Sequence, residues 1–165
     1  MTIAFVVATV LMVAVAMAQS LAHALEYPGK MRLAKEEYLA VQPIYYPGFT
    51  VGGAAEPLGI LALGALLFVH ADGTEFWLTL GALAALAASH LTYWLLTHPV
   101  NDFWLKDIGL KGAGKGFFGS DPLKRGKARN DADWTDLRNR WERSHVLRAI
   151  LSFASLAMLV AAVGS

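Results

Sequence analysis

The chain has 165 residues, of which 56% are hydrophobic and only 16% are charged, and its formal net charge is +1. The mean hydropathy of +0.44 lies well above that of ordinary soluble domains, so most of the chain is predicted to lie in lipid. The small net charge gives no reason to expect a nucleic-acid partner. The absence of cysteine excludes disulfide scaffolds, thiolate metal sites and thiol catalysis.

Four apolar segments are long enough to cross a bilayer, which takes about 20 residues of helix. Because backbone polar groups in lipid must be satisfied within the segment, we predict helices rather than open strands. The fold class is therefore predicted to be all-α, an up-and-down bundle of four transmembrane helices in a single domain, residues 1–165. The four spans are expected at about residues 2–25, 51–71, 74–97 and 145–163.

The first span has no lysine or arginine before its apolar run, so we interpret it as a retained helix and not as a signal peptide. The loop that follows, residues 26–50, is predicted to contain a short interfacial helix at about residues 31–42. Prolines should end that helix before the chain enters the membrane again. Tyrosines in this loop are expected at the depth of the lipid headgroups, namely Tyr38, Tyr45 and Tyr46.

The second and third spans are separated only by Asp72 and Gly73, which predicts a tight turn between two antiparallel helices. Small residues allow helices in a membrane to approach closely. The glycines expected to serve this purpose are Gly52, Gly53, Gly59, Gly64 and Gly81.

The loop before the fourth span, residues 98–144, contains a glycine- and lysine-rich stretch. Residues 109–116 match the spacing of a phosphate-binding loop up to its lysine, but Gly116 stands where a serine or threonine is needed. We therefore predict no nucleotide site there. A capping acid, Asp131 or Asp133, is predicted to begin a helix that extends the fourth span into the cytoplasm without a break.

The basic residues predict the orientation, because lysine and arginine are retained on the cytoplasmic side during insertion. Both loops that carry them would lie on the same side of a four-span protein. We predict a multi-pass protein of a bacterial-type inner membrane with both termini outside. The fourteen basic residues are Lys30, Arg32, Lys35, Lys106, Lys111, Lys115, Lys124, Arg125, Lys127, Arg129, Arg138, Arg140, Arg143 and Arg148.

Each of the four spans carries polar residues toward the same, cytoplasmic end, at spacings that place them on one helix face. Polar and ionisable groups inside a membrane are costly, so each requires a partner or a function. The groups that lie along these faces are Gln19, His23 and Glu26, then Glu56, then His90, Trp94 and Asn101, and finally Trp141, His145, Arg148, Ser152 and Ser155.

This convergence allows three interpretations. The first is a polar pocket within the bundle that opens toward the cytoplasm. The second is a structural network in which Glu56 and Arg148 neutralise each other, as in a noncatalytic accessory subunit of a larger membrane complex. The third is a haem or non-haem iron centre of a membrane redox protein, whose ligands would be His23, His90, His145 and Glu56.

Three short motifs carry a resemblance to a known family. They are Pro47-Gly48-Phe49 after the interfacial helix, Pro99-Val100-Asn101 after the third span, and Trp141, His145 and Arg148 in a Trp-x-x-x-His-x-x-Arg pattern. In this order the chain resembles the anthrone-oxygenase-like family of small four-helix membrane proteins. The resemblance implies a cofactor-independent oxygenase that converts an anthrone-like polycyclic phenol to a quinone with molecular oxygen.

Such a reaction needs a base, a cation that holds the resulting anion, and a pocket poor in water. Under the resemblance, His145 is the candidate base, Arg148 stabilises the anion, and Glu56 or Glu26 orients them. No cofactor or metal is required, and the expected partners are the bilayer and a hydrophobic aromatic small molecule. A second copy of the chain or a larger membrane complex is a further candidate partner. The candidate substrate-binding residues are His23, Glu26, His90, Trp94, Asn101 and Trp141.

Overall fold

The computed structural model describes residues 2–70, 72–105 and 133–165, and within them every regular element is helical. The glycine- and lysine-rich stretch and the sequence that resembles a phosphate-binding loop lie outside the described residues. In chain order the elements are α1 (Ile3–Lys30), α2 (Lys35–Val41), the 3-10 helix η1 (Gln42–Tyr45), α3 (Gly48–Gly52), α4 (Ala55–Leu67), α5 (Gly73–Thr92), the π-helical turn η2 (Tyr93–Thr97), α6 (His98–Leu105) and α8 (Trp134–Gly164).

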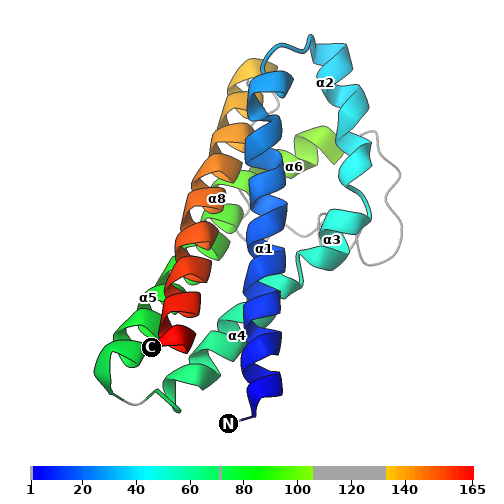
Figure 1. The fold of residues 1–165 in the computed structure, drawn as a ribbon. Coiled ribbons are helices and arrows are strands. Elements are labelled where there is room, and N and C mark those ends of the chain that lie inside the picture. The colour runs from blue at the N-terminus through cyan, green and yellow to red at the C-terminus, as the bar shows by residue number, and fades with distance from the viewer. Residues whose placement is uncertain (1, 71, 106–132) are drawn as a thin grey trace.

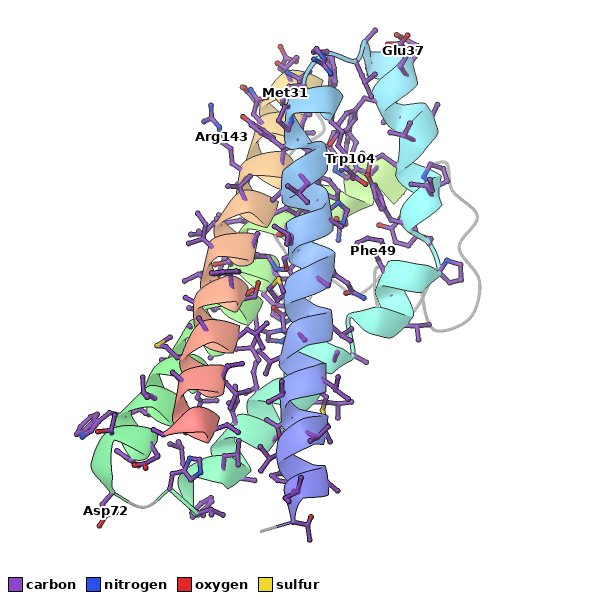
Figure 2. All side chains as sticks on the ribbon, in the orientation of Figure 1. Met31, Glu37, Phe49, Asp72, Trp104 and Arg143 are labelled. Carbon is purple, nitrogen blue, oxygen red and sulfur yellow. The ribbon has the colours of Figure 1, made fainter. Side chains whose placement is uncertain are left out.

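Four helical stretches are long and apolar enough to cross a membrane, which confirms the predicted all-α architecture with four spans. Figure 1 shows both termini and the turn between α4 and α5 at one end of the bundle. The α1–α2 connection and the beginning of α8 lie at the opposite end, so neighbouring spans run up and down. Figure 2 labels Asp72 at the first end and Met31, Glu37 and Arg143 at the second.

Helix α1 is longer than predicted, because it continues through Pro28 to Lys30. The apolar run predicts its end at about residue 25, and a proline removes a backbone donor and usually interrupts a helix. Here Pro28 lies in the last turn, and Met31 closes the helix end by donating to the Tyr27 carbonyl. The extra turns carry Lys30 into the interior of the protein, where it is 5% exposed.

The segment between the first and second spans is folded more tightly than the sequence suggested. The helix predicted at about residues 31–42 is present only as α2, followed directly by η1. The second span is not one continuous α-helix, because a turn at Gly53 and Ala54 separates α3 from α4. Tyr38 and Tyr45, which we expect at the depth of the lipid headgroups, do not face outward, since both side chains are buried within the protein.

The third span continues past its predicted end near residue 97. Helix α5 passes through η2 into α6, although α6 contains Pro99. In an α-helix, residue 99 would donate to the carbonyl of Leu95, but proline has no N–H group. Arg140 of α8 donates to that carbonyl through Nη2 at 2.7 Å. A side chain from a neighbouring helix thus satisfies the backbone acceptor that the proline leaves open.

The fourth span and its extension form one continuous helix, as predicted, and this helix has 31 residues. Of the two capping acids considered, Asp133 occupies the N-cap position, and its side chain accepts a hydrogen bond from the Thr135 amide at 2.8 Å. Asp131 lies outside the described residues.

Among the described residues the bundle has two separate hydrophobic clusters, one near each end. The cluster near the termini is purely apolar and contains Val13, Ala16, Leu63, Leu66, Ala82, Leu86 and Leu159. The other is largely aromatic and contains Tyr38, Tyr45, Val100, Trp104, Leu137 and Trp141. The polar groups that concern function lie next to the aromatic cluster.

One of the predicted glycine contacts shows why a small residue is needed. A Cβ atom on Gly59 of α4 would lie 3.2 Å from Leu86 Cδ2 and 3.5 Å from Val13 Cγ2, so α4 packs closely on both α5 and α1. The expectation for Gly64 is wrong, because nothing lies within 4 Å of the corresponding position.

Candidate functional site

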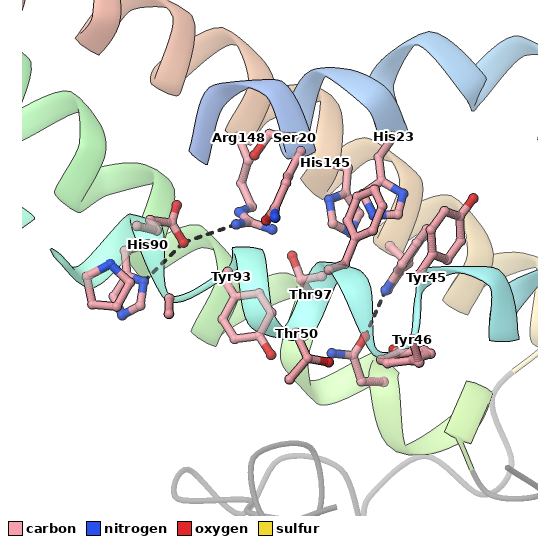
Figure 3. Close-up of a pocket in the computed structure, with 18 residues that line it drawn as sticks. Ser20, His23, Tyr45, Tyr46, Thr50, His90, Tyr93, Thr97, His145 and Arg148 are labelled. Atoms are coloured by element: carbon pink, nitrogen blue, oxygen red, sulfur yellow. Dashed lines mark hydrogen bonds and ion pairs between the residues drawn. The ribbon is translucent and has the colours of Figure 1, made fainter. Parts of the chain in front are cut away.

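A cavity of about 370 Å³ lies between the helices next to the aromatic cluster. All four spans contribute to its wall, together with η1, α3 and α6 (Figure 3). Its lining residues are Gln19, Ser20, His23, Tyr45, Tyr46, Phe49, Thr50, Gly53, Ala54, Glu56, Pro57, His90, Tyr93, Thr97, Asn101, Trp141, His145 and Arg148.

Most of the predicted site residues meet at this cavity. Glu26 and Trp94 do not contribute to its lining and instead contact residues that do. The predicted site residues that line it are His23, Glu56, His90, Asn101, Trp141, His145 and Arg148.

Glu56 is the centre of a network on one side of the cavity. Its carboxylate accepts hydrogen bonds from Arg148 Nη2 at 3.1 Å and from Ser89 Oγ at 2.9 Å, and it lies 3.2 Å from Nδ1 of His90. Figure 3 shows the bonds to Arg148 and His90 as dashed lines. Buried charges in proteins are expected to be paired in this way, because an isolated one is strongly destabilised.

Trp94 fixes the hydrogen-bonding roles of His90. The indole Nε1 of Trp94 can only donate, and it lies 3.0 Å from His90 Nε2, which must therefore be the unprotonated nitrogen. The proton of the neutral ring is consequently on Nδ1, from which it is donated to Glu56. His90 thus has both nitrogens engaged and acts as an orienting group for the carboxylate.

Arg148 carries its charge from α8 to the edge of the cavity. One of its terminal nitrogens is bound to Glu56, and the guanidinium carbon lies 5.1 Å from the centre of the Tyr93 ring. Its Nε atom is buried and has no hydrogen-bond partner among the described residues. The ion pair therefore leaves part of the guanidinium unsatisfied beside the cavity.

His145 is the most unusual of the polar side chains in the cavity. It is only 4% exposed, yet neither of its ring nitrogens has a hydrogen-bond partner within the described part of the chain. Buried polar groups are normally satisfied, so an exception requires an explanation, such as a ligand or a catalytic role. Its ring packs 4.1 Å from that of His23 and 4.3 Å from that of Trp141, centre to centre.

A second network of polar side chains lies next to the cavity, near the end of α1, and was not predicted from the sequence. Its centre is Lys30, whose ammonium nitrogen lies 2.8 Å from Glu26 Oε2, 3.7 Å from Glu142 Oε1 and 3.3 Å from His23 Nδ1. We had interpreted Lys30 only as a basic loop residue. Its position seven residues after His23, on the same face of a helix that continues past residue 25, is the signal that could have revealed it.

Two tyrosines close this second network. Tyr38 donates to Glu142 Oε1 at 2.8 Å, and Tyr45 donates to Glu26 Oε2 at 2.5 Å. Burial, followed by the charge of Glu142, raises the pKa of Tyr38. Burial and the hydrogen bond to Glu26 likewise raise the pKa of Tyr45. Both phenols are therefore held in the protonated form as donors.

The aromatic wall of the cavity is oriented by further hydrogen bonds. The indole of Trp141 donates to Asn101 Oδ1 at 2.9 Å, which joins α8 to α6. One helical turn away, Thr97 Oγ1 lies 2.8 Å from Ser144 Oγ, and Ser144 donates to the Trp141 carbonyl. These bonds fix the orientation of Trp141, which forms one side of the cavity.

The predicted metal ligands do not converge on one point. His90 and Glu56 belong to one network, whereas His23 and His145 stack against each other. Across residues 2–70, 72–105 and 133–165, no group of three histidine, aspartate or glutamate side chains is placed to hold a metal ion. The donor set therefore does not fit a non-haem iron centre held jointly by these four side chains.

Fold and cavity together define a class, namely a multi-pass helical membrane protein with a cavity lined by all four of its spans. The family model described as anthrone oxygenase matches residues 44–158, which is more than half of the chain. The chain therefore belongs to the anthrone oxygenase family. No curated protein and no solved structure matches it.

Proposed function

We propose that the protein is a cofactor-independent oxygenase that oxidises an anthrone-like aromatic phenol in the cavity between its spans. The observation that carries the proposal is the state of His145, which is buried at the cavity with both ring nitrogens unpartnered among the described residues. A histidine in that state can accept a proton from a bound molecule without first losing another hydrogen bond. Membership of the anthrone oxygenase family supports the same chemistry.

The other groups of the cavity have complementary roles. Arg148 stabilises the anion that forms when the substrate loses a proton, and Glu56 holds the guanidinium in position. His90 in turn holds Glu56, with its own proton fixed by Trp94. This arrangement places a fixed positive group and a free base on the same helix, α8, three residues apart.

The proposed reaction balances without a cofactor. His145 takes a proton from the substrate CH₂ group, and the electron pair stays on the substrate as a delocalised anion. The anion gives one electron to O₂, and the two radicals combine to form a C–O bond. The protonated His145 returns its proton to the peroxide. Loss of the second C–H proton to the base and of hydroxide from the O–O bond then gives a ketone and water.

The cavity suits an aromatic substrate of two or three rings. Its volume of about 370 Å³ lies within the range of small-molecule sites. Phe49, Tyr93 and Trp141 provide aromatic wall, and the polar groups described above lie at its edge. A hydrophobic aromatic molecule would thus be held away from water, which prolongs the life of a reactive anion.

The distribution of basic residues supports an orientation in an inner membrane, with both termini outside and the cavity nearer the cytoplasmic side. Lys30 and the residues of α2 lie at the end of the bundle opposite the termini (Figure 1). A substrate made in the cytoplasm would then reach the cavity from that side.

An oxygen electrode tests the proposal directly. Purified protein in detergent, treated with a chelator, is mixed with an anthrone, and we expect oxygen uptake and the absorbance of the quinone above the buffer rate. His145→Ala should lower the rate by about 100-fold or more, since general-base catalysis typically contributes that much.

His70→Ala is the matched control, because His70 lies at the other end of the bundle and is bonded to Thr79 at 2.9 Å. Its rate should equal that of the unchanged protein. A rate no higher than that of buffer, or equal rates for the unchanged protein and His145→Ala, would refute the proposal.

A further inference from the structure

The second network raises the question of what His23 does in the cavity, since its ring lines the wall beside His145. His23 is 4% exposed and is surrounded by the rings of Tyr45, Phe49 and Trp141 at 4.4, 4.7 and 5.0 Å between centres. Its polar neighbours include Lys30, Glu26 and the ring of His145, and of these three Lys30 is the one within hydrogen-bond distance of Nδ1. The nature of that contact determines which hydrogen bonds His23 can make.

Lys30 meets His23 as an ammonium group. Its nitrogen forms an ion pair with Glu26 at 2.8 Å and lies near the carboxylate of Glu142, which is fully buried. The same nitrogen lies 4.6 Å from the centre of the Tyr45 ring and 5.1 Å from that of Trp141, distances that favour a cation. Carboxylates and ring faces thus surround the charge and compensate for its burial.

An ammonium group can only donate, so Nδ1 of His23, at 3.3 Å, must be the acceptor. The competing partner of Nδ1 is the Glu26 carboxylate, which is 3.9 Å away and too distant for a hydrogen bond. With Nδ1 unprotonated, the ring carries its single proton on Nε2. His23 therefore presents an N–H group and no free lone pair.

We infer that His23 is a hydrogen-bond donor to the bound substrate, and that Lys30 is the positioning residue that fixes His23 in this tautomer. The catalytic part of the inference rests on the proposed oxygenase function, whereas the tautomer does not. The two stacked histidines then have opposite roles. His145 has open nitrogens and accepts the proton, while His23 donates to the oxygen atom on which negative charge develops.

This division of roles explains why a charged lysine is buried outside the cavity. Without Lys30, either nitrogen of His23 could carry the proton, and the ring could present a lone pair to the anion. A lone pair would repel the charge that Arg148 and the N–H group together stabilise. The network of Lys30, Glu26 and Glu142 thus acts on the reaction through His23.

The tautomer can be observed directly by ¹⁵N NMR of histidine-labelled protein in detergent micelles, where long-range couplings distinguish Nδ1–H from Nε2–H. The signals of His23 are assigned as those missing in His23→Gln. We expect a single neutral Nε2–H form, and a mixture of both tautomers in Lys30→Met. An Nδ1–H or doubly protonated ring in the unchanged protein, or an unaltered spectrum in Lys30→Met, would overturn the inference.

A pair of amide substitutions tests the donor role in catalysis. The amide nitrogen of His23→Gln can occupy the place of Nε2, whereas that of His23→Asn can reach only the place of Nδ1. We expect His23→Gln to retain kcat within about 10-fold and His23→Asn to lose about 100-fold, the loss typical for one donor to a developing anion. Equal losses in both variants would overturn the donor role.

The failures of the two ideas are distinguishable. If no preparation consumes oxygen, the oxygenase proposal fails, and the spectrum of the unchanged protein still decides the tautomer. If Lys30→Met does not fold, that spectrum and the comparison of the two amide variants remain decisive. His70→Asn, at the other end of the bundle, should change neither the His23 signals nor kcat.

Discussion

The ion pair between Glu56 and Arg148 leads to a prediction about stability that is independent of any substrate. Glu56 joins α4 to α8 through Arg148 at 3.1 Å and to α5 through Ser89 and His90. The side chains of the ion pair are only 7% and 13% exposed, so removal of either one leaves a largely buried charge. Breaking such a pair from one side typically costs about 3–5 kcal/mol in the free energy of unfolding.

We therefore expect Glu56→Leu to lower the stability by about 3 kcal/mol, the low end of that range because Arg148 is not fully buried. In a protein of this size this corresponds to a fall in Tm of roughly 6–12 °C. Arg148→Met should lower it similarly. The double variant should be less destabilised than the sum of the two single changes, since the second substitution removes the charge that the first one left unpaired.

The measurement is thermal unfolding of the four proteins in the same detergent, followed by circular dichroism. The double-mutant cycle isolates the coupling between the two side chains. If the stability losses of the two single variants sum to that of the double variant within about 0.5 kcal/mol, the two side chains are not energetically coupled, and the reasoning is refuted.

Two further predictions concern the phenols and the glycines. Because the pKa values of Tyr38, Tyr45 and Tyr46 are all raised by burial, these phenols should stay protonated one pH unit above the ordinary tyrosine value of about 10, and absorbance at 295 nm should report fewer phenolates than in the unfolded chain. Their raised pKa values stabilise the folded state fully at pH values below about 10. That stabilisation is lost as the pH rises further, so the protein should unfold over the same pH range in which these phenols ionise. Gly59→Leu should destabilise by about 1–3 kcal/mol through overpacking against α5 and α1, whereas Gly64→Leu, where nothing lies within 4 Å, should not; equal effects in thermal unfolding would contradict the packing.

The number of helices and their directions, which the lipid environment determines, could be predicted from the sequence. A long apolar segment in lipid has only the helix available to it, so four helices and their alternating directions follow from hydropathy and loop lengths. Local spacing also predicted which polar residues share a helix face. His23, Glu56, His90 and His145, each from a different span, all line the cavity.

The details that could not be predicted all depend on contacts between distant parts of the chain. Pro99 continues a helix because Arg140 of another helix satisfies the Leu95 carbonyl. Tyr38 points into the protein because Glu142, 104 residues away, accepts a hydrogen bond from its hydroxyl group. Neither partner can be identified from the residues around the proline or the tyrosine.

The roles of the three histidines at the cavity show the same limit most clearly. In the sequence His23, His90 and His145 are equivalent, since each lies on a polar face at a similar depth. Their hydrogen bonding differs through their neighbours: Trp94 binds His90, Lys30 binds His23, and no described residue forms a hydrogen bond with the ring nitrogens of His145. The Trp94–His90 contact joins residues that are four positions apart on one helix, so it could be anticipated from helix geometry. The Lys30–His23 contact required a helix that continues beyond Pro28, which only the folded chain reveals. The proposal that His145 is the base thus rests on which histidines already have hydrogen-bond partners, and not on any property of His145 alone.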